Sequence, residues 1–242
     1  MAYRFASQET DYRDFASGQV FFSAPGQPAF PVRLTSEIFQ RCQALRQDTK
    51  PVTVYDPCCG SGYHLAALGL LHGSQLKQLI ASDINPDAVI LATRNLSLLT
   101  QEGLAQRQKA IQLSWENFGK QSHQDALITV KRLQQRLEAT KAIATRCFVA
   151  DATQPGGIAA ALPYPVDLVI SDLPYGQLSS WQGMANEQNA IWHLLEQLQP
   201  CLHEASVVAL ATAKNVTVNH EHYQRYGRFR HGKRLITFLK RG

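Results

Sequence analysis

The sequence lacks the features of a membrane-spanning, secreted or zinc-binding protein. No apolar run approaches the roughly 20 residues that a membrane-spanning helix needs. The first residues lack the apolar stretch of a secretory signal, and the cysteines show no CxxC or Cys/His zinc spacing. We therefore expect a cytoplasmic protein with no membrane segment and no metal, whose cysteines, including the adjacent Cys58 and Cys59, are reduced.

A dinucleotide-binding fingerprint is also missing. Gly60 and Gly62 could begin a GxGxxG pattern, but the third position is Leu65 rather than glycine. The chain contains no GxxxxGK[ST] phosphate-binding loop either. The absence of these two motifs argues against NAD and FAD as ligands. It is compatible with a nucleoside ligand that has no pyrophosphate.

The sequence does contain enough apolar residues for a core, together with a basic C-terminal tail. Its 242 residues, 45% of them hydrophobic, suit one α/β domain over residues 1–242. From Lys214 to Gly242 there are eight lysines and arginines against one acid, Glu221, whereas the rest of the chain is close to neutral. This asymmetry indicates a polyanionic partner, the alternative being a solvated basic face.

Short β-rich runs alternate with helical stretches, which favours a mostly parallel sheet with helices on both faces. The predicted strands are Val52–Asp56, Gln78–Asp83, Thr145–Ala150, Val166–Ser171 and Ser206–Thr212, followed by two antiparallel strands that turn around His231–Gly232. The predicted helices are Ser61–His72, Pro86–Leu99, Gln101–Asn117, Ser122–Lys141 and Asn186–Leu198. The third and fourth helices form an insertion at about residues 101–143. The proline-rich segment Ser23–Pro31 is either a lid over a ligand or a chain packed across the sheet.

Four acids stand at or just after the ends of the first four predicted strands: Asp56, Asp83, Asp151 and Asp172. Ligands of open α/β sheets bind beyond the carboxyl ends of the strands, so these acids indicate one crevice. We expect Asp83 to accept both hydrogens of a ribose diol, although it or Asn85 could instead cap the helix that follows. Asp151 could contact an adenine amino group or simply form a turn.

The run Val169–Gly176 (VISDLPYG) suits methyl transfer to a nitrogen on a planar ring. Such a nitrogen is a poor nucleophile because its lone pair is delocalised. The Asp172 carboxylate and the Leu173 carbonyl can accept its hydrogens, Pro174 can fix the turn, and Tyr175 can stack on the ring. Taken alone, the DLPY sequence could also be an ordinary turn at the end of a strand.

Two motifs resemble those of class I methyltransferases that act on nucleic acids. Asp56–Gly62 (DPCCGSG) is similar to their DPxCGSG motif, and Asp172–Tyr175 (DLPY) is similar to their [ND]PP[YF] motif, in the form seen in RNA guanine methyltransferases. YDPCCGSGY, the SAPGxPAFPVRL-like N-terminus and the helical insertion resemble the avilamycin-resistance 23S ribosomal RNA guanine methyltransferases. Leu173 replaces the first proline of the common motif, which disfavours DNA adenine enzymes, and Tyr63 stands where many relatives have threonine.

The resemblance implies a Rossmann-like class I fold, S-adenosylmethionine as the cofactor, and antibiotic resistance as a possible consequence. The implied catalytic residues are Asp172, Leu173, Pro174 and Tyr175, and the implied cofactor-binding residues are Asp56, Cys58, Gly60, Gly62, Asp83, Ile84, Asp151 and Ala152.

The expected activity is methylation of a guanine in 23S ribosomal RNA by a monomer, at an exocyclic amino group. The alternative position is the ring nitrogen N1, where Asp172 would have to act as a true base. A protein or small-molecule N-methyltransferase would leave the basic tail unexplained. A non-catalytic RNA-binding assembly factor would have no need of the set of acids together with Tyr175.

Overall fold

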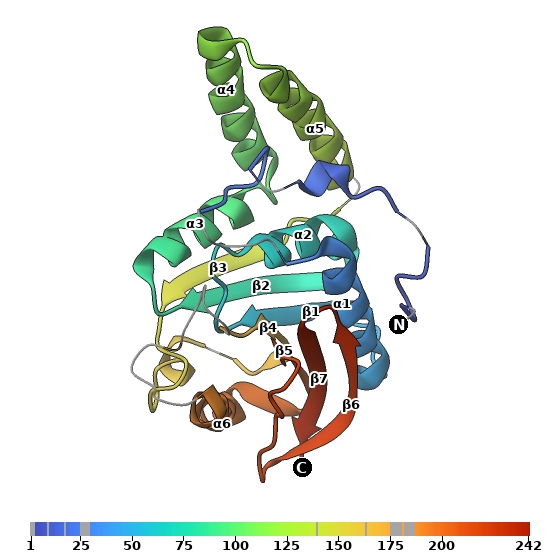
Figure 1. The fold of residues 1–242 in the computed structure, drawn as a ribbon, viewed down its shortest axis with the longest axis vertical. Coiled ribbons are helices and arrows are strands. Elements are labelled where there is room, and N and C mark those ends of the chain that lie inside the picture. Colours follow the sequence, from blue (N-terminus) through green and yellow to red (C-terminus); the bar gives the residue numbers. More distant parts are fainter. Residues whose placement is uncertain are drawn as a thin grey trace.

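Seven strands form one sheet in the order β3-β2-β1-β4-β5-β7-β6 in a computed structural model of the chain (Figure 1). The structure describes residues 3–8, 10–16, 18–24, 30–138, 140–162, 164–174, 181 and 187–242. The strands are β1 (Val52–Asp56), β2 (Leu76–Asp83), β3 (Ala144–Val149), β4 (Val166–Asp172), β5 (Leu202–Ala213), β6 (Tyr223–His231) and β7 (Arg234–Arg241). The first five strands pair in parallel, and β7 pairs antiparallel with both β5 and β6.

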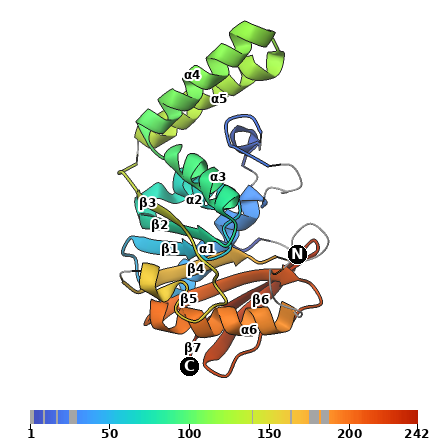
Figure 2. The same cartoon turned by 90° about the vertical axis from the view of Figure 1, so that its left-hand side faces the viewer.

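Helices cover both faces of the sheet because its central strands are apolar on both faces. The helices are α1 (Val32–Arg46), α2 (Tyr63–His72), α3 (Pro86–Ser97), α4 (Gln101–Phe118), α5 (Gln121–Glu138) and α6 (Glu187–Leu198). Every residue of β1 is buried; Val54 belongs to the apolar cluster that includes Leu68 of α2, and its neighbour Tyr55 to the cluster that includes Leu195 of α6. This alternation places α1, α2 and α3 on one face and α6 on the other (Figure 2). Among the described residues, no helix has the length and apolarity that crossing a membrane requires.

The predicted α/β fold, with its C-terminal antiparallel strands, is confirmed, but the sequence analysis missed α1. This helix has no acidic residue in its first turn, and its N-cap is Pro31, which makes no side-chain capping hydrogen bond. The usual start signals are therefore missing. The helix forms because its apolar face is buried against the sheet and α2, with Leu34, Ile38 and Phe39 among the most buried side chains of the chain.

The two helices predicted between residues 101 and 141 are α4 and α5. They pair along an apolar seam that contains Ile111, Val130 and Leu133, and together they project away from the sheet (Figures 1 and 2). The Thr100 hydroxyl caps α4 by accepting a hydrogen bond from the Gly103 amide at 3.0 Å.

Part of the Ser23–Pro31 segment, residues 25–29, lies outside the described residues. The chain just before it is held against α3, because Asn95 both accepts from the Phe22 amide (2.8 Å) and donates to the Phe22 carbonyl (2.9 Å). Phe21 is fully buried against Phe15 and Tyr63. Whether residues 25–29 form a lid stays an open prediction.

Candidate active site

The loop between β1 and α2 is organised by a carboxyl group that lies inside the protein. Asp56 is fully buried, and its Oδ1 accepts hydrogen bonds from the Cys58 amide (3.0 Å) and the Ser171 hydroxyl (2.6 Å). Burial raises the pKa of Asp56 to about 8. Its Oδ2 lies 3.2 Å from Nε2 of buried His64, whose own pKa is lowered by burial. The structure therefore places Asp56 as the internal support of the loop.

The two glycines of this loop have separate reasons to be glycine. Both have positive φ, 51° at Gly60 and 66° at Gly62. The Gly60 amide donates to Asp83 Oδ2 at 2.8 Å, which ties the loop to the end of β2. A Cβ on Gly62 would lie 2.9 Å from Ala92, so Gly62 allows α2 and α3 to pack closely.

A hollow opens at the carboxyl ends of β1, β2, β3 and β4. Its lining contains six residues expected from the sequence, namely Cys58, Asp83, Ile84, Asp151, Ala152 and Pro174. It also contains Pro57, Ala150, Thr153 and Trp181, which the sequence analysis did not name. Among the described residues that were predicted for the site, Asp56, Gly60, Gly62, Asp172 and Leu173 do not line it. The volume is about 50 Å³. Ligand pockets usually measure roughly 300–1,000 Å³, so the hollow encloses only part of the space that a nucleoside occupies.

Asp83 and Asp151 both line the hollow and both stabilise local turns. Asp83 Oδ1 accepts from the Asn85 amide at 3.0 Å. Asp151 Oδ1 accepts from the Thr153 amide (2.9 Å) and hydroxyl (2.7 Å). The turn-forming alternative considered for Asp151 is thus present, and it leaves Asp151 in the lining. A ligand contact by either acid stays a prediction.

Asp172, at the end of β4, forms a multiple ion pair with Arg234 of β7. Arg234 Nε lies 3.1 and 3.4 Å from the two carboxylate oxygens, and Nη2 lies 2.9 Å from Oδ2. The side chains are 23% and 16% exposed, so the pair is reachable from solvent. Leu173 is buried and its amide donates to the Ala211 carbonyl, whereas Tyr175 lies outside the described residues.

The other cations of the basic tail differ in their surroundings. Lys240 donates to the Leu45 carbonyl, and Arg241 to the carbonyls of Gln199 and Leu202. The exposed members are Lys214, Arg225, Arg228, Arg230, Lys233 and Arg241. Phosphate contacts are therefore expected mainly from β6 and the turn that follows it.

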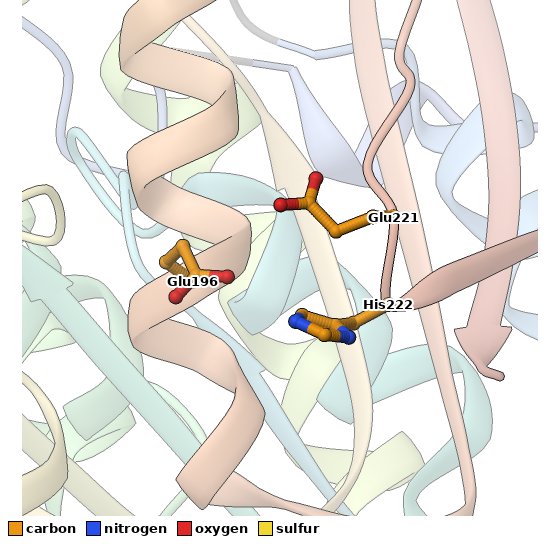
Figure 3. A group of neighbouring side chains, drawn as sticks. All are labelled: Glu196, Glu221 and His222. Atoms are coloured by element: carbon orange, nitrogen blue, oxygen red, sulfur yellow. The ribbon is translucent and has the colours of Figure 1, made fainter.

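A separate group of side chains, Glu196, Glu221 and His222, lies between α6 and the segment that leads into β6 (Figure 3). Glu196 Oε1 lies 3.0 Å from Nε2 of buried His220, and Glu221 accepts from the Trp192 indole at 3.0 Å. These contacts join the segment before β6 to α6.

The strand order, the glycine turn after β1 and the acids at the strand ends define the chain as a Rossmann-like class I methyltransferase. It belongs to the rRNA methyltransferase AviRa family, whose model matches residues 1–234. The chain is thus an rRNA methyltransferase.

Individual relatives agree with this assignment. The chain is 44% identical over 211 residues to the 23S rRNA (guanine(2535)-N(1))-methyltransferase of Streptomyces viridochromogenes, covering 86% of this chain and 84% of the relative. The solved structure of rRNA methyltransferase aviRa from the same organism superposes with a TM-score of 0.89 at 39% identity, covering 99% and 96% of the two chains. TrmN from Thermus thermophilus shares the fold alone, with a TM-score of 0.53 at 15% identity over 89% of this chain and 50% of TrmN. The name of the Streptomyces relative states that it methylates guanine at N1, whereas the sequence of this chain led us to expect methylation of an exocyclic amino group.

Proposed function

We propose that this protein transfers a methyl group from S-adenosylmethionine to N1 of a guanine in 23S ribosomal RNA, in the cytoplasm. The observation that carries the proposal is the position of Asp172, a partly exposed carboxylate at the end of β4, on the strand next to β1 and its glycine turn. The name of the 44% identical relative supports N1 over the exocyclic nitrogen. N1 keeps its proton at neutral pH, so its methylation needs a base, and Asp172 is the group proposed for that role.

The hollow contains groups suited to the nucleoside part of the cofactor. Asp83 supplies a carboxylate for the ribose diol, and Asp151 supplies an acceptor for the adenine amino group. Ile84 is 37% exposed and Pro174 lies in the lining, so apolar surface is available on both sides of a flat ring. The sulfonium of the cofactor supplies an electrophilic methyl group.

Asp83→Ala is expected to weaken binding of S-adenosylhomocysteine by roughly 10- to 150-fold, or about 1.5–3 kcal/mol, because alanine cannot make the charge-assisted hydrogen bonds to the ribose. Isothermal titration calorimetry measures the effect. Asp87→Ala is the matched control, because Asp87 is an exposed acid at the start of α3, outside the lining. Equal affinity of a folded Asp83→Ala variant and the wild type would remove Asp83 from the cofactor site.

Tritiated methyl transfer tests the proposed substrate class. Radiolabel from S-adenosylmethionine is followed into separate pools of ribosomal RNA, protein and small metabolites, with heat-inactivated protein as the control. We expect incorporation into ribosomal RNA. Incorporation into protein or metabolites only would support the N-methyltransferase alternatives, and none in any pool would support a non-catalytic binding protein.

A further inference from the structure

Arg234 belongs to the basic tail by sequence, but the fold separates it from the exposed cations. It is the first residue of β7, where it pairs with Ala213 at the end of β5. β5 in turn pairs in parallel with β4, on which Asp172 is opposite Ala211. Because β7 runs antiparallel to β5, its first residue lies beside the carboxyl end of β5 and close to the carboxyl end of β4. Two residues 62 positions apart thereby meet at the proposed reaction centre.

Among the described residues, the guanidinium of Arg234 has neighbours on at least two sides. One side is the Asp172 carboxylate, with Nη2 to Oδ2 at 2.9 Å. Another is the ring of Phe30, whose centroid lies 5.0 Å from Arg234 Cζ, and Phe30 is itself buried against His64. A cation stacked on an aromatic ring and paired with a carboxylate loses little freedom when a further acceptor approaches.

Between them, Arg234 and Asp172 carry the N–H donors and the two carboxylate oxygens that guanine requires as partners. Guanine carries an acceptor, O6, beside two donors, N1–H and the N2 amino group. An arginine N–H beside two carboxylate oxygens is the complementary series, the same one that cytosine presents in a base pair. Adenine carries a donor at position 6 and an acceptor at N1, so it would face donor to donor and acceptor to acceptor.

We propose that Arg234 is a catalytic and guanine-selecting residue that donates to O6 of the target base while Asp172 accepts the N1 proton. This inference rests on the proposed function. When guanine binds, at least one hydrogen bond between Arg234 and Asp172 is replaced by a hydrogen bond to the base.

The proton and the electrons balance in one displacement. The N1–H proton passes to the Asp172 carboxylate, and the N1 electron pair forms the bond to the methyl carbon. The carbon–sulfur bond breaks with its electrons going to sulfur, which leaves neutral S-adenosylhomocysteine. As N1 gives up its proton, negative charge spreads to O6, and Arg234 stabilises that charge. The proton leaves Asp172 to solvent afterwards.

Other titratable groups surround the pair. Asp56 of β1 and His64 of α2 both interact with the charge of Asp172, whereas His231, at the end of β6, interacts with the charge of Arg234. Burial lowers the pKa of His64 and of His231 and raises that of Asp56, so all three favour their neutral forms. Among the described residues, Arg234 is then the cation in direct contact with the Asp172 carboxylate.

The test compares Arg234→Gln, Arg234→Lys and wild type in single-turnover methylation of ribosomal RNA, with saturating S-adenosylmethionine, between pH 7 and 9. At pH 7 we expect Arg234→Gln to be about 100-fold slower, as is typical when one preorganised electrostatic partner is removed. The ratio of the wild-type rate to the Arg234→Gln rate should fall as the pH rises, because guanine N1 then loses its proton to solvent without stabilisation by Arg234. Arg234→Lys should recover part of the rate because it keeps the charge. Lys77→Gln, which removes a charge from an exposed position near the start of β2, is the matched control and should match wild type.

The outcomes separate the two proposals. A rate for Arg234→Gln within a few-fold of wild type, with N1-methylguanosine as the product, would overturn the role of Arg234 and leave the proposed function standing. A deficit that is equal at every pH, or that comes with weaker binding of S-adenosylhomocysteine, would make Arg234 a structural residue. Failure of the wild type to form N1-methylguanosine would refute the proposed function itself.

Discussion

Asp172→Ala is expected to slow methyl transfer by at least about 100-fold at saturating cofactor and RNA, because positioned general bases typically contribute 10²–10⁴-fold. The substitution removes the group that takes the N1 proton, and it also leaves Arg234 without the carboxylate that faces it. Single-turnover rates measure the effect, and affinity for S-adenosylhomocysteine should stay near the wild-type value.

Asp172→Asn distinguishes the two possible acceptor nitrogens. Asparagine keeps an acceptor oxygen but cannot take a proton, so methylation at N1 should be nearly as slow as in Asp172→Ala. Methylation of an exocyclic amino group needs only an acceptor, and there the asparagine variant should retain an intermediate rate. Asp87→Asn serves as a control for the loss of one negative charge at an exposed position. A fully active Asp172→Ala enzyme would place the reaction centre elsewhere in the chain.

Replacing the exposed cations Arg225, Arg228, Arg230 and Lys233 with glutamine is expected to weaken RNA binding and flatten its dependence on salt. Each phosphate that is no longer neutralised by a cation should reduce the slope of log affinity against log salt by roughly 0.7–0.9, or about 3 for all four. Fluorescence anisotropy of a labelled ribosomal RNA fragment at several salt concentrations measures the slope. Arg234 is left out of this set because it faces Asp172, and cofactor affinity should not change.

The matched comparison is a variant with Lys109, Lys120 and Lys131 replaced, because these are exposed cations of α4, α5 and the turn between them. Three other cations of this region have contacts within the protein: Arg107 donates to the Val20 carbonyl, Arg132 pairs with Asp14, and Arg136 lies over Phe15. If the lysine variant lost the salt dependence while the β6 variant kept it, the RNA would run over the helical hairpin.

Local patterns were enough to predict most of the sheet and the lining of the hollow. β1 begins and ends at the predicted residues, because an apolar run there is bounded by Pro51 and the turn after Asp56. Asp83 and Asp151 could be placed together because parallel strands end at one sheet edge. The same reasoning could not show that Asp56 is buried, because its partners Ser171 and His64 come from β4 and α2.

Contacts between distant parts of the chain account for what the sequence analysis missed. Arg234 was counted with the basic tail, because nothing near it in the sequence indicates a partner 62 residues away. Trp181 has no motif around it, yet it lines the hollow. The DLPY motif also does not indicate which guanine nitrogen is methylated, because a carboxylate can serve either as a hydrogen-bond acceptor or as a base.

Mass spectrometry of the modified nucleoside distinguishes methylation of guanine at N1 from methylation at the exocyclic nitrogen. Unmethylated ribosomal RNA is incubated with the wild-type protein and S-adenosylmethionine, digested to nucleosides, and compared with N1- and N2-methylguanosine standards. We expect N1-methylguanosine from the wild type, formed at least about 100-fold more slowly when Asp172→Ala replaces it. N2-methylguanosine as the product would contradict the assignment of Asp172 as a base and of Arg234 as the group that stabilises O6.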